Sequence, residues 1–219
     1  TMINQSNNIH IGYQAGYTST SDNNIFVGAS AGTKNTVGTN NIFMGTQAGE
    51  GANTYGTSGQ QTGDYNTFLG YKAGNANYSG DKNIFMGYRA GLSSQLGSKN
   101  IFIGDNTGSQ GDTSHNIFIG TATNDAEGVG YKAISGGQYN VFVGHDVGIE
   151  NTTGTQNIFL GDKAGKSNTT GEKNIYIGTN AGRDANSSTA DNNIAIGTDA
   201  GVYNQTGQEN ILIGKQVAG

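Results

Sequence analysis

The sequence predicts an all-β fold, a parallel β-solenoid or β-roll of about twelve short coils, on three observations. Residues 174–182, which read NIYIGTNAG, have a counterpart at twelve places in the chain. Of the eleven spacings between the leading asparagines, six are 17 residues and two are 16. A fixed period of this kind indicates a stack of identical supersecondary units. The centre of each unit is three apolar residues bounded by Asn and Gly, which favours a short strand.

The units follow one another with two insertions and no composition shift that would mark a domain boundary. The leading asparagines are Asn8, Asn24, Asn41, Asn66, Asn83, Asn100, Asn116, Asn140, Asn157, Asn174, Asn193 and Asn210. One insertion, residues 50–65, lengthens the third unit, and the other, residues 125–139, interrupts the seventh. We therefore expect residues 1–219 to form a single repeat array. Because terminal repeats are normally atypical and the last unit ends within a repeat, we also expect a fragment of a longer fibre.

Three columns of the repeat predict how a coil is built. The asparagines are expected to form a ladder in which each side chain bonds the turn backbone and the neighbouring asparagine. Alanine recurs at the seventh position after the asparagine, as in Ala181, and is expected to point inward from a second, shorter strand. Glycine follows the strand in all twelve units and recurs at the eighth position in ten, so glycine marks turns here and not a flexible linker.

The second strand position holds every phenylalanine of the protein, and this column predicts how chains associate. Side chains alternate along a strand, so this position faces one way and its two aliphatic neighbours face the other. A roll with one interior buries only one of two apolar faces, and the rest of the coil, mostly polar with a single alanine column, is a poor cover. We expect the column to form the interface of a homotrimer; a wider solenoid that covers the rings itself is the alternative. The interface residues would be Phe26, Phe43, Phe68, Phe85, Phe102, Phe118, Phe142, Phe159 and Tyr176.

The eleventh unit, residues 192–200 with the sequence NNIAIGTDA, resembles the head repeat of trimeric autotransporter adhesins. That family repeats a motif close to Asn-Ser-Val-Ala-Ile-Gly-x-x-Ala, and related repeats occur in phage-type and contractile-injection tail fibres. The resemblance covers residues 8–219 and implies left-handed parallel β-rolls that assemble as trimers. The units here are longer, and Phe replaces the small Ala in most of them.

Composition excludes several classes of function. The net charge is −5 without a basic run, so we expect no nucleic-acid partner. The chain has no cysteine, which excludes disulfides and thiolate metal sites. No apolar run approaches the roughly 20 residues of a membrane helix, so no membrane insertion is expected.

Nothing in the sequence predicts an enzyme. The histidines, His10, His115 and His145, lie in distant units, and the pair His145-Asp146 falls at variable turn positions. Gly165-Lys166-Ser167 lacks the upstream glycine of a phosphate-binding loop, and the calcium-binding nonapeptide is absent. We expect no catalytic residue, no metal and no cofactor.

A rigid array of this kind supplies length and a multivalent surface. We expect a structural or adhesive segment of an extracellular fibre, borne by a cell surface or a particle, whose partners are its own copies and a host surface, matrix or glycan. A tail-fibre segment of a phage-like or contractile injection particle is the alternative, and an ice-binding solenoid is a further one. Insertions often carry binding, so the candidate ligand residues are Tyr55, Tyr65, Tyr131 and Tyr139, unless the insertions only decorate the edge.

Overall fold

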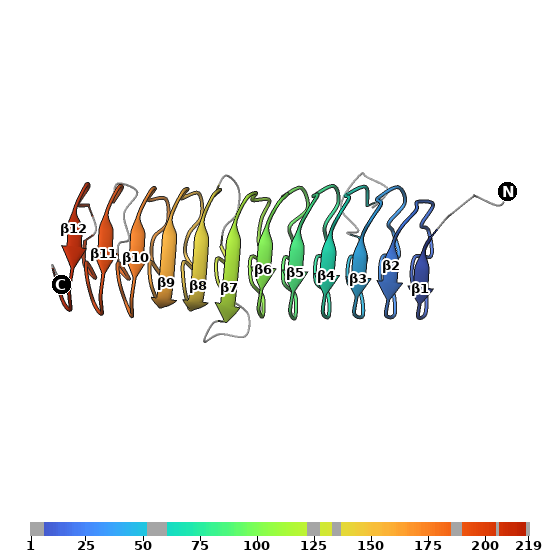
Figure 1. Cartoon of the computed structure of the whole chain (residues 1–219), viewed down its shortest axis with the longest axis horizontal. Helices are drawn as coiled ribbons and strands as arrows, with labels where there is room; N and C mark the ends of the chain where they lie inside the picture. Colours follow the sequence, from blue (N-terminus) through green and yellow to red (C-terminus); the bar gives the residue numbers. More distant parts are fainter. Residues whose placement is uncertain are drawn as a thin grey trace.

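A computed structural model describes residues 7–51, 61–121, 128–132, 137–184, 190–204 and 206–217. Twelve strands form one parallel sheet whose spatial order is the chain order, and they lie side by side along one long axis (Figure 1). The strands are β1 (Ile9–Ile11), β2 (Ile25–Val27), β3 (Ile42–Met44), β4 (Thr67–Leu69), β5 (Ile84–Met86), β6 (Ile101–Ile103), β7 (Ile117–Thr121), β8 (Val141–His145), β9 (Ile158–Asp162), β10 (Ile175–Ile177), β11 (Ile194–Ile196) and β12 (Ile211–Ile213). The all-β parallel solenoid is confirmed, and at one strand spacing per coil it is about 55 Å long.

The asparagine ladder fixes the register between coils, as the sequence predicts. The backbone N–H of Asn83 donates to Oδ1 of Asn66 at 3.0 Å, and that of Asn100 donates to Oδ1 of Asn83 at 2.9 Å. The side-chain amide of Asn83 also donates to the carbonyl oxygen of Gly97 at 2.8 Å. One side chain thus joins two coils and satisfies buried polar groups that would otherwise cost about 1–3 kcal/mol each.

The phenylalanine column forms the core inside the single chain. From His10 to Tyr176 the rings stack one per coil, with neighbouring centroids 4.7–5.0 Å apart. The ring of Phe85, for example, is fully buried between those of Phe68 and Phe102, at 4.9 Å from each. This spacing equals the separation of paired strands, so the sheet register itself sets the stacking distance.

Small residues on the opposite wall of the coil cover the rings. Ala90 is fully buried, and Gly91 follows it with φ +61°, so close to the core that a Cβ there would lie 2.5 Å from ring carbons of Phe85. The coil is therefore only one aromatic ring thick. The predicted role of this column as an interchain interface is wrong: Phe26, Phe43, Phe68, Phe85, Phe102, Phe118, Phe142, Phe159 and Tyr176 are at most 2% exposed in the single chain. Alanine does point inward, but its segment is a turn and not a second strand.

Two columns of residues other than glycine adopt the left-handed backbone conformation at the two ends of the strands. One is the residue before the asparagine, such as Lys99 at φ 59°, and the other is the second residue after the strand-ending glycine, such as Arg89 at φ 54°. Such angles are uncommon for side chains of this size. Hydrogen bonds to the preceding coil hold them: Lys99 N–H donates to Asp81 and Arg89 N–H to Tyr71, both at 2.9 Å.

The seventh coil closes with residues from within its insertion, residues 125–139. Val129 and Gly130 take the places that alanine and glycine hold in other coils. Val129 is fully buried, and a Cβ on Gly130, at φ +62°, would lie 2.5 Å from a ring carbon of Phe118. The ring stack therefore continues past the insertion.

Candidate functional site

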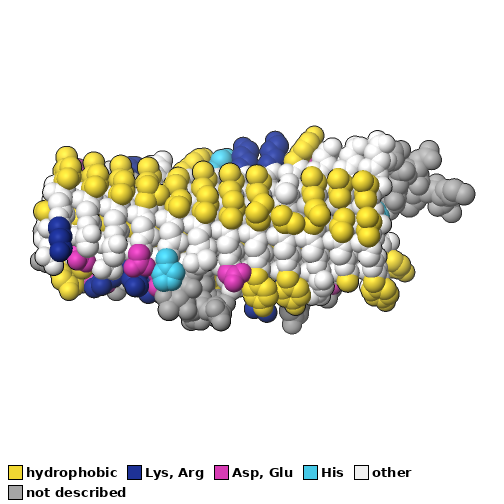
Figure 2. Space-filling model, turned by 60° about the horizontal axis from the view of Figure 1, so that its bottom comes forward, with side chains coloured by type: hydrophobic (Ala, Val, Ile, Leu, Met, Phe, Trp, Pro, Cys, Tyr) yellow, Lys and Arg dark blue, Asp and Glu magenta, His cyan; other side chains and the backbone are white. Residues whose placement is uncertain are grey.

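The outward face of the sheet is an apolar strip with a single polar member, Thr67, and we call it the aliphatic face. It consists of the first and third residues of each strand, because strand alternation directs both away from the ring stack. Its members are Ile9, Ile11, Ile25, Val27, Ile42, Met44, Thr67, Leu69, Ile84, Met86, Ile101, Ile103, Ile117, Ile119, Val141, Val143, Ile158, Leu160, Ile175, Ile177, Ile194, Ile196, Ile211 and Ile213. Figure 2 shows the strip running along the length of the molecule.

The aliphatic face is comparable to the largest apolar patches that soluble monomers expose. In mid-strip Ile84 and Met86 are 39% and 38% exposed, although neighbouring coils flank both, and Ile211 at the last strand reaches 69%. Twelve strand spacings by three residues give a flat projection of about 500 Å². The accessible area is greater, since the side chains stand out from the sheet. Exposed apolar patches of this size mark interaction surfaces.

The tyrosines predicted to bind a ligand are not brought together. Tyr65 and Tyr139 are 57% and 54% exposed, and both lie directly before a leading asparagine, but four coils separate them. Tyr139 stacks on His115 with ring centroids 4.9 Å apart. Tyr131 is half-buried and its hydroxyl accepts a hydrogen bond of 2.6 Å from a neighbouring glutamine. Tyr55 lies outside the described residues. The described tyrosines of the two insertions do not form one site.

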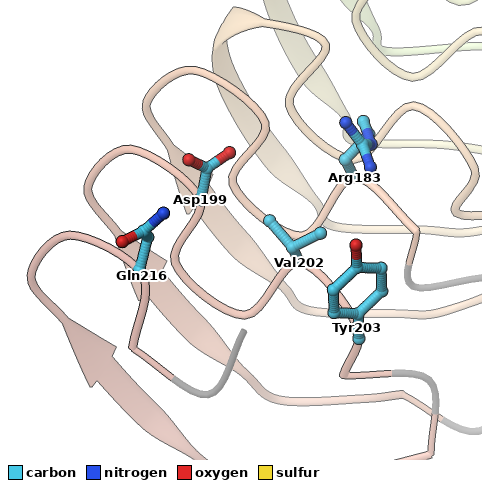
Figure 3. Close-up of a pocket in the computed structure, with 5 residues that line it drawn as sticks. All are labelled: Arg183, Asp199, Val202, Tyr203 and Gln216. Atoms are coloured by element: carbon cyan, nitrogen blue, oxygen red, sulfur yellow. The ribbon is translucent and has the colours of Figure 1, made fainter.

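A cavity of about 470 Å³ lies near the C-terminal coils, lined by Arg183, Asp199, Val202, Tyr203 and Gln216 (Figure 3). The charged groups that line it already have partners. Arg183 donates two hydrogen bonds to the neighbouring Asp184, at 3.0 and 2.7 Å, and this contact raises the pKa of the guanidinium above its usual value. Asp199 accepts a hydrogen bond of 2.9 Å from a neighbouring asparagine side chain. The cavity therefore lacks a charged group free to fix a ligand, and it is a weaker candidate than the aliphatic face.

Sequence reasoning missed one contact between ionisable groups. Nδ1 of His145 lies 2.8 Å from Oδ1 of Asp162, and these residues are register partners at the ends of β8 and β9. Asp162 is 17 positions from the histidine, so the signal was the repeat period and not proximity in sequence. The sequence paired His145 with Asp146 instead; Asp146 is in fact almost fully buried and contacts Lys166 at 3.3 Å.

Over the parts of the chain that the structure describes, no group of three or more His, Cys, Asp or Glu side chains is arranged to hold a metal ion. No helix long and apolar enough to cross a membrane occurs in the same ranges. Comparison with protein-family models, with curated proteins and with solved structures finds no match. The candidate functional site therefore stands on the geometry of the chain alone.

Proposed function

We propose that this chain is a rigid structural segment of an extracellular fibre, in which three copies join through their aliphatic faces. The observation that carries the proposal is the face itself: 23 of its 24 side chains are apolar, Thr67 being the exception, and none of the 24 is buried in the part of the chain that the structure describes. Repeated water-exposed aliphatic side chains are costly at about 25 cal/mol per Å² of apolar surface. Association of identical flat faces removes that cost.

The width of the face supports three copies around a common axis. Strands of three residues give a face about 10 Å wide, and three such faces set as a triangle place each sheet about 3 Å from the axis. Isoleucine, leucine and methionine side chains span that distance. A closed cyclic arrangement also leaves no aliphatic face free to recruit further chains.

A stiff trimeric rod suits attachment, because weak contacts repeated on three chains gain from effective concentration. The segment would then be a shaft or head that presents binding groups away from a cell surface. The same rod in a phage-like or contractile injection particle would act as a tail-fibre segment. In either role, the chains must first assemble into the trimer.

Sedimentation equilibrium of the unaltered chain tests the assembly. We expect three times the 22.6 kDa chain mass. The double variant Met86→Lys, Leu160→Lys places charges on the aliphatic face and should yield monomers that keep a β-type far-ultraviolet circular dichroism spectrum. The control Ser93→Lys, Thr153→Lys adds the same charge at exposed positions outside the strands and should remain trimeric. An unaltered chain that sediments as a monomer overturns the proposal.

A further inference from the structure

Two tyrosines and two cations form a compact group where β4 and β5 turn away from the sheet. Tyr71 and Tyr88 follow the strand-ending glycines of adjacent coils, and their rings stack with centroids 5.4 Å apart at 15°. Lys72 Nζ lies over the Tyr71 ring, 5.3 Å from its centroid, and Arg89 Cζ lies 4.9 Å from that of Tyr88. We call these four residues the tyrosine–cation cluster.

The cluster is fixed by the backbone and not only by its side chains. Lys72 and Arg89 both have left-handed backbone angles, φ 55° and 54°. Their N–H groups donate to carbonyl oxygens of the preceding coil, at 3.0 Å for Lys72 and 2.9 Å for Arg89. Two cationic groups are thus held one coil apart over aromatic rings. A ligand that binds them has less side-chain ordering to impose, which favours affinity.

Like Lys82 and Lys99, and unlike the ion-paired cations of the chain, Lys72 and Arg89 have no carboxylate partner among the described residues. Lys163, Lys166 and Arg183 each lie 2.7–3.5 Å from an aspartate. Among the described residues, no Asp or Glu lies within 4.0 Å of Lys72 or Arg89. In a chain of net charge −5, this is a local positive site with no ion pair to a described carboxylate.

We propose that the tyrosine–cation cluster binds an acidic polysaccharide, with its carboxylate or sulfate groups on Lys72 and Arg89. A guanidinium offers a planar pair of donors that matches such oxyanions. Tyr71 and Tyr88 are 39% and 41% exposed, so their hydroxyls and ring edges remain open to neutral sugar units on either side. The negative charge of the whole chain disfavours a dense polyanion such as nucleic acid, whereas a polysaccharide separates its charges by neutral groups.

The site is distinct from the aliphatic face, so this inference holds or fails independently of trimer assembly. Binding is measured with immobilised chondroitin sulfate and hyaluronan as probes, with neutral dextran and double-stranded DNA as comparisons, at physiological salt. We expect the unaltered chain to retain at least one acidic polysaccharide and not dextran. Failure to retain either acidic probe, or stronger retention of DNA, overturns the inference.

A matched pair of variants separates the cluster from general charge. Lys72→Gln, Arg89→Gln removes two positive charges from the cluster and should weaken binding about tenfold, since charge-assisted hydrogen bonds are lost. Lys82→Gln, Lys99→Gln removes the same charge from exposed left-handed positions at the opposite end of the strands and should change affinity less than about twofold. Equal losses in both variants overturn the inference. Sedimentation of each variant checks that its assembly is unchanged.

Discussion

The two faces of the same twelve strands are both apolar, yet one is the core and the other is bare. Phe85 is fully buried, while its strand neighbours Ile84 and Met86 are 39% and 38% exposed. What differs is the wall opposite: Ala90 is fully buried and Gly91 lies against the Phe85 ring, whereas no described residue buries the aliphatic side chains. Hydrophobicity alone therefore does not determine which face of the sheet is buried. The small size of the residues on the opposite side of the coil determines it.

The largest expected difference between the two faces is in the loss of stability when one side chain on each face is shortened. Phe85→Ala removes a fully buried ring with rings stacked on both sides, and should lower the free energy of unfolding by about 3–5 kcal/mol. Ile84→Ala, on the outward face of the same strand, should cost a monomer less than about 1 kcal/mol. Urea denaturation of both variants on a monomeric background, such as Met86→Lys with Leu160→Lys, measures the difference. Similar losses would contradict the assignment of the two faces.

Enlarging the wall tests the thinness of the coil. Gly91→Ala puts a Cβ 2.5 Å from the Phe85 ring at a backbone angle of +61°, so we expect a loss of about 2 kcal/mol. Gly137→Ala is the control, because the nearest atom to its Cβ would lie at 3.3 Å. Thermal melts of the two variants should separate clearly. If Gly91→Ala is as stable as the control, the wall is not in contact with the rings.

Filling a break in the ring stack should raise the free energy of unfolding, by less than the preceding core substitutions lower it. Ala195 follows Tyr176 in the column, and a Cβ on the facing Gly201 would first meet Cδ1 of Leu212 at 3.1 Å, a looser contact than the 2.5 Å between Gly91 and the Phe85 ring. Ala195→Phe should extend the stack and raise the free energy of unfolding by about 1 kcal/mol, the usual value of a buried aromatic pair. The same substitution outward, Ile194→Phe, should leave monomer stability nearly unchanged. Destabilisation by Ala195→Phe would mean that the C-terminal coils are narrower than the rest.

The smallest expected effect is a dependence of the stability of the first coil on pH. His10 occupies the phenylalanine place and stacks on Phe26 at 5.0 Å, and burial lowers its pKa below the model-compound value of 6.5. The unfolded chain thus binds a proton more readily than the folded one, so stability is complete above pH 6.5 and falls as the pH drops through the lowered pKa. The protection factors of the amides of residues 9–11, which correct for the intrinsic pH dependence of exchange, should be lower at pH 5 than at pH 7.5. His10→Phe should remove the difference.

The sequence predicted the parts of the fold that depend on local pattern. All twelve strands lie directly after their predicted asparagines, and the asparagine ladder pairs as expected. It misassigned the buried face because a single alanine column seemed too small to cover Phe, whereas Gly91 lets the backbone itself form the wall. Left-handed Lys99 and Arg89 carry no sequence signal, since long side chains rarely adopt that conformation.

The candidate sites were harder to predict because they arise between coils. The aliphatic columns were visible in the sequence, but choosing them as the interface required knowing that the rings face inward. Contacts such as His145 with Asp162, or Tyr71 with Tyr88, join residues 17 positions apart. Such pairs become visible only when the units are aligned in register, and the insertion at the seventh coil shifts that alignment for Val129 and Gly130.

Strict neighbour pairing has a consequence for how the chain reaches this structure. Each strand pairs only with the strands before and after it in the chain, as with Ile84 and Ile101, which are 17 positions apart in 219 residues. The ratio of this sequence separation to the chain length, a measure of relative contact order, is about 0.08. This value is within the range of helical bundles that fold in microseconds to milliseconds and below that of most all-β proteins. Coils can therefore add one after another to any nucleus, and the chain should fold fast for a sheet protein while it is still being synthesised.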